Sequence, residues 1–335
     1  MRMIAAASVV LGMFGLVSAC SKHDQTTVFA EGDWRNEMST VRIGLRASED
    51  DAFKVRRWEV FQETLSEVTG LPVKVFEASD YNGIIQAIAS DQIDLASFGP
   101  GSYANVYAQV GDDVTPILAT RESTGVMGYY SGIVVRADTP YQSIEDLEGQ
   151  PLAFVDFNST SGYIYPRWKM RQAGIEPDTF FSESAMAGGH LQSVMAMQNG
   201  QFDAAVVSLS RGTPEYGFRG GSIFRMARLG LVDINDFRII WAAGPIPRSP
   251  MAVRTDRPQE FKDLLRGAIA SLAFDQPEVI AEMGRMPGSN YAAVDHAYYQ
   301  EIVDIRAEEI KEQRMRFARR TPDEPQGSRY ASATQ

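Results

Sequence analysis

Short apolar runs alternate along the chain with segments in which apolar residues recur every three or four positions. Strands buried on both faces give continuous apolar runs, whereas helices packed on a sheet give the longer period. The pattern therefore predicts an α/β fold with largely parallel sheets. The predicted strands are Val41–Leu45, Val73–Glu77, Leu95–Phe98, Ser131–Val135, Leu152–Val155, Ala204–Val207 and Phe237–Ala242. The predicted helices are Trp58–Val68, Tyr81–Ser90, Ser102–Val110, Tyr163–Ala173, Leu191–Asn199 and Gln259–Phe274.

Two segments, Tyr81–Phe98 and His190–Val207, resemble one another when they are aligned without gaps. The identical pairs are Ala87 and Ala196, Gln92 and Gln201, Asp94 and Asp203, and Ala96 and Ala205. Each segment is predicted to form a helix, a tight turn and a strand. Two such units indicate a protein of two lobes, in which Tyr81 and His190 start equivalent helices. A cleft between the lobes would let the phenol and the imidazole face one ligand.

The leading candidate for a binding site is the cluster Asn158–Gly162, which lies between a predicted strand and a predicted helix. A helix N-terminus offers unpaired N–H groups and a positive dipole end, so it binds an anion without a counter-charge. Ser159, Thr160 and Ser161 add three hydroxyl donors. One hydroxyl is enough to cap a helix, so three in a row favour a ligand over capping alone.

Composition and charge narrow the function further. The formal net charge of −11 argues against a nucleic-acid surface, which would be basic. It leaves room for a small anion, because hydroxyls and backbone N–H groups bind anions without a net positive field. The content of 44% hydrophobic and 22% charged residues is that of a soluble globular protein, and the central part is long enough for two lobes.

The sequence offers no catalytic centre. The three histidines, His23, His190 and His296, lie far apart and lack metal-ligand spacing. Gly99–Ser102 follows a predicted strand but lacks the lysine of a P-loop, and no nucleophile elbow or dinucleotide fingerprint is present. Glu308 and Glu309 are interpreted as solvated charges. We therefore expect no catalytic residues, no metal and no cofactor.

The N-terminus has the pattern of a secretory signal peptide, with Arg2 before an uncharged apolar run that ends at Ala19. The segment Val17–Cys20 is similar to a bacterial lipobox, so Cys20 is the expected lipidation site. The alternative is an ordinary signal peptide with an incidental cysteine. We expect a signal peptide at 1–19, a lipidated tether at 20–40 and a disordered tail at 319–335.

The chain resembles the periplasmic substrate-binding proteins of phosphonate, phosphite and phosphate ABC transporters, which have the type II periplasmic-binding fold. The resemblance runs from about Val41 to about Met286. Its motifs are Trp58–Glu59–Val60–Phe61, Ser79–Asp80–Tyr81, Gly83–Ile84–Ile85–Gln86, Gly128–Tyr129, Asn158–Gly162, Gly189–His190 and Ile246–Pro247. The resemblance implies two lobes, 41–130 with 245–318 and 131–244, that close on a small phosphorus oxyanion and deliver it to an ABC permease.

In that family, the residues that match Tyr81, Tyr129, Ser159, Thr160, Ser161 and His190 hold the phosphonate oxygens. Members that bind aminoalkyl phosphonates place carboxylates at the positions of Ser210 and Ser249, where they bind the ammonium group. Both positions are serine here, with Arg211 and Arg248 beside them. We therefore expect weak binding of aminoethylphosphonate and favour phosphite, methylphosphonate or phosphate.

Three other functions remain open. The ligand could be another small anion or a phosphorylated metabolite. The protein could also present its ligand to a membrane receptor as a sensor module. An enzyme, such as a secreted phosphoesterase, is disfavoured because no nucleophile and base have convincing spacing. We expect a monomer, since nothing in the sequence indicates an oligomer, and a periplasmic lipoprotein anchored by Cys20.

Overall fold

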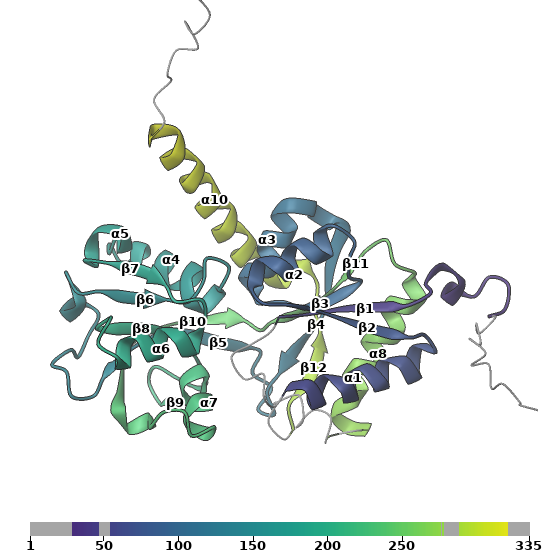
Figure 1. Cartoon of the computed structure of the whole chain (residues 1–335), viewed down its shortest axis with the longest axis horizontal. Helices are drawn as coiled ribbons and strands as arrows, with labels where there is room; N and C mark the ends of the chain where they lie inside the picture. The colour runs from purple at the N-terminus through teal and green to yellow at the C-terminus, as the bar shows by residue number, and fades with distance from the viewer. Residues whose placement is uncertain (1–28, 47–53, 276, 278–287, 321–335) are drawn as a thin grey trace, which may run out of the picture.

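The computed structural model describes residues 29–46, 54–275, 277 and 288–320. Two six-stranded sheets form the centres of two lobes, which lie side by side with helices around each sheet (Figure 1). The predicted signal peptide, Cys20 and the part of the tail beyond residue 320 lie outside the described residues. Within these residues, no helix is both long and apolar enough to cross a membrane.

The first lobe contains the sheet of order β12-β4-β11-β3-β1-β2. Strands β2 and β3 are parallel to β1, whereas β11 and β12 run antiparallel to their neighbours. Its strands are β1 (Val41–Arg46), β2 (Val73–Ala78), β3 (Leu95–Ser97), β4 (Val114–Arg121), β11 (Pro250–Arg254) and β12 (Asn290–Ala293). Its helices are α1 (Lys54–Thr69), α2 (Tyr81–Ala89), α3 (Pro100–Val110) and α8 (Gln259–Asp275).

The second lobe contains the sheet of order β10-β5-β8-β6-β7, with β9 paired to β8. Its strands are β5 (Gly128–Arg136), β6 (Leu152–Phe154), β7 (Ser184–Met186), β8 (Ala204–Thr213), β9 (Gly217–Gly221) and β10 (Phe237–Pro247). Its helices are α4 (Tyr165–Gln172), α5 (Pro177–Phe180), α6 (His190–Gln198) and α7 (Ser222–Arg228).

The predicted α/β class is confirmed, but the prediction of largely parallel sheets is wrong. The chain enters the second lobe between β4 and β5 and returns between β10 and β11. These two crossings run in opposite directions, so β5 and β10 pair antiparallel along most of their length. Each sheet is therefore mixed. Strands β5 and β10 lie wholly in the second sheet, and the predicted lobe limits at 130 and 244 fall inside them.

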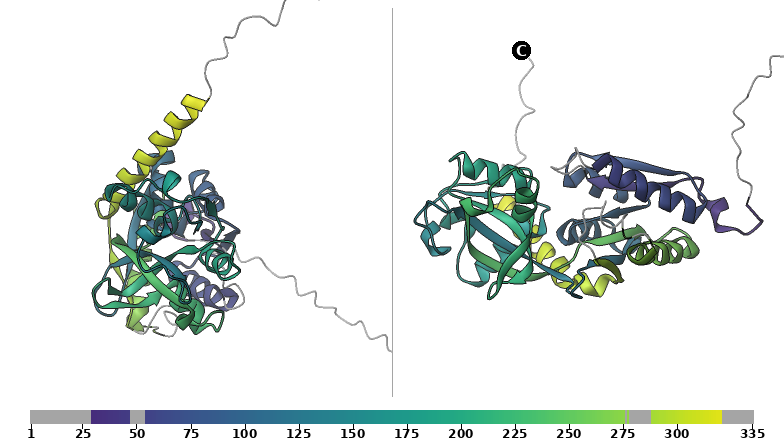
Figure 2. Two further views of the ribbon diagram at one scale, coloured as in Figure 1. Left: turned by 90° about the vertical axis from the view of Figure 1, so that its left-hand side faces the viewer. Right: turned by 90° about the horizontal axis from the view of Figure 1, so that it is seen from below.

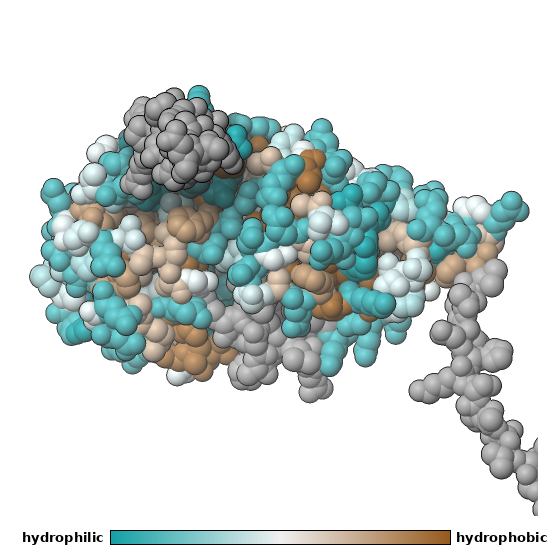
Figure 3. All heavy atoms as spheres, turned by 45° about the horizontal axis from the view of Figure 1, so that its top comes forward, coloured by the Kyte–Doolittle hydropathy of each residue, from teal (hydrophilic) through white to brown (hydrophobic). Residues whose placement is uncertain are grey.

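Each lobe has an apolar core where helices pack on its sheet. In the first lobe, Phe61, Leu65 and Phe261 are fully buried in one core cluster. In the second lobe, Phe154 and Met170 are fully buried in another. Outside the cores, the face shown in Figure 3 is mostly hydrophilic, with small apolar patches on both lobes.

Two terminal segments extend these cores. At the N-terminal end, Trp34 packs on Phe261 with the ring centroids 5.6 Å apart, so the described part of the predicted tether contacts the first lobe. At the other end, α10 (Gln300–Arg320) starts at the junction of the lobes and runs beside α3 and α4 (Figures 1 and 2). Tyr299, just before α10, is buried in the first lobe, whereas Ile302 and Ile305 are buried in the second. Helix α10 therefore packs on both lobes.

Candidate functional site

The predicted hydroxyl cluster lies in a buried loop between β6 and α4. We call residues 156–162 the anion loop. Its last residues enter a π-helical turn, Thr160–Ile164, which precedes α4. Ser159, Thr160 and Ser161 are only 3%, 2% and 3% exposed. Helical structure therefore begins at Thr160, three residues before the predicted start at Tyr163, because a π-helical turn precedes α4.

The three hydroxyl residues differ in what they bind within the protein. Ser159 is the helix cap, and its side-chain oxygen accepts the Gly162 N–H at 3.1 Å. The side-chain oxygen of Thr160 accepts the Gly101 N–H of α3 at 2.7 Å. Ser161 is held through its backbone oxygen, which accepts the Ser131 hydroxyl at 2.7 Å. The Ser159 oxygen therefore caps the helix, as the capping interpretation requires, but a hydroxyl that accepts one hydrogen bond can still donate its own hydrogen to another acceptor.

Close packing explains the glycines around the loop. A Cβ at Gly162 would lie 2.4 Å from Cβ of Val155, so β6 and the turn approach as closely as backbone allows. A Cβ at Gly101 would lie 2.5 Å from Cδ1 of Ile164 and 3.2 Å from Oγ1 of Thr160. The start of α3 in the first lobe therefore packs directly on the loop of the second.

Tyr129 lies where several predicted site residues meet. Burial raises the pKa of Tyr129 to about 12, although hydrogen bonds from the Thr160 and Ser161 hydroxyls act in the opposite direction. Tyr81 from the first lobe is close enough to raise this pKa slightly, and Arg248 is close enough to lower it. At neutral pH the phenol therefore keeps its proton and can donate a hydrogen bond. The structure brings Tyr81, Tyr129, Thr160 and Ser161 together.

Tyr81 and His190 occupy the equivalent positions that the repeated segments predict. Tyr81 is the first residue of α2, where the Asp80 carboxylate accepts the Gly83 N–H at 2.8 Å and caps the helix. His190 is the first residue of α6, with Nδ1 3.4 Å from the backbone oxygen of Val206 in β8. Strand β8 lies between β5, which carries Tyr129, and β6, which leads into the anion loop. His190 therefore contacts β8, the strand next to the one that carries Tyr129.

Ser210 and Ser249 lie in different parts of the structure, in β8 and at the return crossing. Tyr130 pairs with Leu209, so the same register carried one residue further puts Ser210 opposite Tyr129. Side chains of directly opposed residues share one face of a sheet. Ser249 follows Arg248 at the return crossing, between β10 and β11.

Arg248 is a charged residue whose place relative to the site could not be predicted from the sequence. Its guanidinium carbon lies 5.9 Å from the centre of the Tyr129 ring. The same guanidinium forms an ion pair with Glu122, and both side chains are mostly buried, at 17% and 16% exposure. The crossing segments therefore place a cation beside Tyr129, with Glu122 as its counter-charge.

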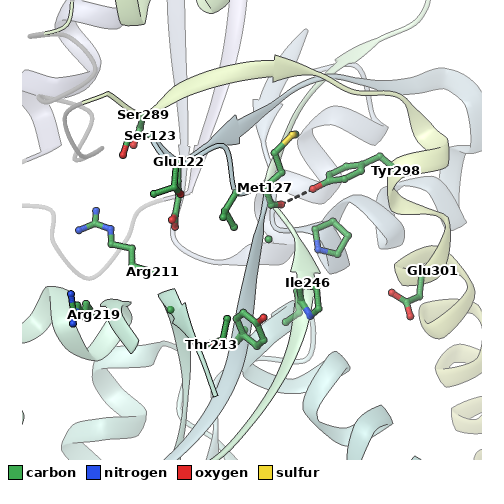
Figure 4. A pocket seen from close by; sticks show the side chains of 17 residues that line it. Glu122, Ser123, Met127, Arg211, Thr213, Arg219, Ile246, Ser289, Tyr298 and Glu301 are labelled. Carbon is green, nitrogen blue, oxygen red and sulfur yellow. Dashed lines mark hydrogen bonds between the residues drawn. The ribbon is translucent and has the colours of Figure 1, made fainter. Parts of the chain in front are cut away.

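A cavity of about 960 Å³ opens between the lobes next to this group. Its walls include Arg211 and Arg219 from the second lobe and Glu122 and Ser289 from the first (Figure 4). Tyr130 also lines it, but Tyr129 does not, as expected for successive strand residues that point to opposite faces. The cavity therefore adjoins the predicted site without containing its six residues.

Sequence reasoning missed the residues that support the anion loop from outside the second lobe. Ser102 and Asn105 of α3 bind Asn158, at 3.2 and 2.8 Å, and Arg306 of α10 binds it at 3.0 Å. The run Gly99–Ser102 is visible in the sequence, but its lack of a lysine only excludes a P-loop and does not predict these contacts. Glu309, interpreted as solvated, is instead buried and pairs with Arg306 at 2.8 Å, because α10 packs on both lobes. Among the described residues, no cluster of three histidine, cysteine or acidic side chains could hold a metal ion.

Comparison with known proteins agrees with this architecture. Residues 43–299 match the family described as the periplasmic substrate-binding protein of phosphonate ABC transporters. The phosphate-import protein PhnD of Mycolicibacterium smegmatis is 33% identical over 209 residues, 60% of this chain and 62% of that protein. The phosphonates-binding periplasmic protein of Escherichia coli is 23% identical over 242 residues, 71% of this chain and 68% of that protein. The match thus spans about two thirds of either relative.

Solved structures share the fold. A binding component of an ABC phosphonate transporter from Pseudomonas aeruginosa is similar with a TM-score of 0.63, at 23% identity over 84% of this chain and 98% of that one. PhnD1 from Prochlorococcus marinus in complex with methylphosphonate gives 0.66, at 18% identity over 82% and 99%. The two-lobed type II periplasmic-binding fold is therefore confirmed. This chain belongs to the periplasmic substrate-binding proteins of phosphonate ABC transporters, a family of transport components rather than enzymes.

Proposed function

We propose that this protein captures a small phosphorus oxyanion between its lobes and delivers it to an ABC permease. The observation that carries the proposal is the convergence of the Thr160 and Ser161 hydroxyls on the Tyr129 phenol, beside Tyr81 of the other lobe. An oxyanion in that space would accept hydrogen bonds from both lobes. Ser159 and His190 complete the proposed contacts, and the α6 N-terminus at His190 adds backbone N–H groups.

The energetics of such a site suit a transport protein. Hydrogen bonds to a charged group are worth about 1.5–3 kcal/mol each. Several such bonds, with the charge of Arg248 nearby, outweigh the free-energy cost of association. The result is a micromolar or lower dissociation constant, which corresponds to a binding free energy of about −8.2 kcal/mol or below. The protein needs no titratable base for this role.

The preference among phosphorus oxyanions follows from Ser210, which lies opposite Tyr129, and from Ser249 at the return crossing. Ser210 and Ser249 offer hydroxyls, and the nearby carboxylate of Glu122 is already paired with Arg248. A ligand ammonium would therefore lose its water without gaining a charge partner. Phosphite, methylphosphonate and phosphate are the favoured ligands, and aminoethylphosphonate is a poor one. Relatives named for phosphate import and for phosphite binding fit this preference.

The proposal places the mature protein in the periplasm as a monomer, tied to a membrane by lipid on Cys20. The lobes, 41–130 with 245–318 and 131–244, would close about the two crossings, since the proposed ligand contacts come from both sides. Labelling with radioactive palmitate tests the anchor. Wild type should take up label and Cys20→Ser should not, and an unlabelled wild type would exclude the lipoprotein.

Thermal unfolding of the soluble domain with added ligands tests the binding function. Phosphite, methylphosphonate and phosphate are compared with aminoethylphosphonate and sulfate. A ligand at one hundred times its dissociation constant stabilises the folded state by about 2.7 kcal/mol, which raises Tm visibly. The proposal predicts a rise with at least one of the first three. A rise with sulfate alone would instead support a different small anion as the cargo.

A further inference from the structure

The anion loop belongs to the second lobe, yet several of its hydrogen bonds come from outside that lobe. Three hydrogen bonds tie it to the start of α3 in the first lobe. They run from Gly101 N to Thr160 Oγ1 at 2.7 Å, from Ser102 Oγ to Asn158 O at 3.2 Å, and from Asn105 Nδ2 to Asn158 Oδ1 at 2.8 Å. The two crossing strands are therefore not the only connection between the lobes.

Asn158 is the centre of these contacts. Its side-chain oxygen accepts from Asn105 and also from the Arg306 guanidinium at 3.0 Å. Arginine can only donate, so the amide oxygen, and not the NH₂ group, must face Arg306. Two donors converge on this one oxygen and occupy both of its lone-pair directions. Its backbone N–H is also bound, to the Asp156 carboxylate at 2.7 Å.

Arg306 holds the loop from α10. It is only 7% exposed, and its guanidinium also donates to the backbone oxygen of Phe157 at 3.1 Å. Glu309, one turn further along α10, balances its charge at 2.8 Å. Nε of Arg306 is buried without a partner in the described structure, so this arginine is held at a desolvation cost. An aliphatic residue would pack here without that cost. The role of Arg306 is therefore to hold the loop through its hydrogen bonds to Phe157 and Asn158.

The contacts also determine the direction of the Thr160 hydroxyl. Its oxygen accepts the Gly101 N–H, so its single hydrogen must point away from α3. That hydrogen is directed toward Tyr129, where the proposed oxyanion would sit. The first lobe therefore orients a donor of the second lobe before any ligand is present.

We infer that Asn158 is a positioning residue, which fixes the anion loop to α3 through Asn105 and to α10 through Arg306 so that its hydroxyls face the ligand. This inference rests on the proposed function for its effect on affinity, but not for its effect on the loop itself. Donors that are ordered in advance bind more tightly because less ordering remains for the ligand to supply. The same contacts keep the loop next to α3, so closure must bring the other ligand contacts toward the loop.

Hydrogen–deuterium exchange of the ligand-free protein tests the positioning directly. Asn105→Ala and Asn158→Ala should accelerate exchange in peptides that cover residues 157–164. Asn158→Asp keeps an oxygen for both donors and should preserve the protection. Gln86→Ala is the matched control, since it removes an exposed hydrogen bond of 3.0 Å between the side-chain amides of Gln86 and Gln109 in the same lobe. Unchanged exchange in both alanine variants would overturn the inference.

Calorimetric affinity for phosphite or methylphosphonate provides the second measurement. Asn105→Ala should weaken binding about tenfold, because the freed loop must be ordered on binding, and Gln86→Ala should leave it unchanged. Asn105→Asp should weaken binding further, since it sets a carboxylate against the Asn158 oxygen. A purely structural role would change the melting temperature without this order of affinities and would contradict the inference. If wild type binds no phosphorus oxyanion, the proposed function fails, and the exchange comparison still decides the inference.

Discussion

The guanidinium of Arg248 lies over the ring of Tyr129, 5.9 Å from its centre, and forms an ion pair with Glu122 on the opposite crossing segment. One cation thus links the two connections between the lobes to the residue at which the anion-loop hydroxyls converge. A positive charge beside a ring of neutral donors favours an anion over a neutral analogue.

Arg248→Ala should weaken oxyanion binding and also lower the free energy of unfolding, because Glu122 is left mostly buried and unpaired. Removing one partner of a fully buried ion pair lowers the free energy of unfolding by about 3–5 kcal/mol. The loss here should be smaller, since both side chains keep some exposure. Urea denaturation and calorimetry separate the two effects. The double variant Glu122→Gln with Arg248→Ala should regain stability but not affinity, and recovery of affinity would show that Arg248 acts only as a structural partner.

Ser161→Ala and Thr160→Val should weaken binding by about 1.5–3 kcal/mol each, roughly ten- to a hundredfold in dissociation constant. Their effects on stability should differ. Ser161→Ala keeps the backbone contact with Ser131 and loses only the hydroxyl's bond to Tyr129, so its melting temperature should fall less than that of Thr160→Val. Thr160→Val leaves the Gly101 N–H without its acceptor and should lower the free energy of unfolding by about 1–3 kcal/mol. Equal melting temperatures for both variants would contradict this assignment.

The pH dependence of stability should carry a contribution from Tyr129. Its pKa in the folded protein is raised to about 12, above the usual value near 10, because burial disfavours the phenolate. The folded state therefore holds the proton more firmly than the unfolded state. This contribution is fully present below pH 10 and is lost as the pH rises toward 12. Tyr129→Phe should show a shallower loss of stability over that range in denaturant titrations, and an identical slope would disprove the burial of the phenol.

Ligand selectivity should change with one carboxylate. Ser249→Asp places a negative charge next to Arg248 in the sequence, at one of the two positions where a carboxylate is expected to favour aminoalkyl phosphonates. Its affinity for aminoethylphosphonate should rise while that for phosphite falls, because the new charge attracts the ammonium and repels a bare oxyanion. Competition titrations measure both. Ser249→Asn is the matched control of similar size, and an equal gain in that variant would show that charge is not the cause.

The sequence predicted the elements that depend on local pattern. All seven predicted strands and six predicted helices appear, most of them within four residues of their expected ends, but β8 extends six residues and β10 five residues beyond the predicted ends. Strands such as β12, and β4 with its internal Pro116, were missed because their runs are short or interrupted. Helix α10 was missed because its many charges resemble a solvated segment, although Arg306 and Glu309 neutralise one another inside the protein.

The site residues, too, could be predicted from the sequence only where the signal is local. The hydroxyls at Ser159–Ser161 are visible in the sequence because they are consecutive at a helix start. The contacts of Asn158 with Asn105 and Arg306 are not, since they join three distant parts of the chain through the packing of two lobes. Arg248 was noticed in the sequence, but only the structure shows that it faces Tyr129 and that Glu122 is its partner. Single polar residues in long-range contacts carry no periodic signal.

The most direct test is a calorimetric titration of the soluble protein with phosphite and with methylphosphonate, repeated on Ser161→Ala. We expect one site per chain, with a micromolar or lower dissociation constant for at least one ligand and binding at least about tenfold weaker in the variant. Equal affinity in the variant would place the ligand away from the anion loop. No heat with either ligand, or with phosphate, would contradict the proposed cargo itself.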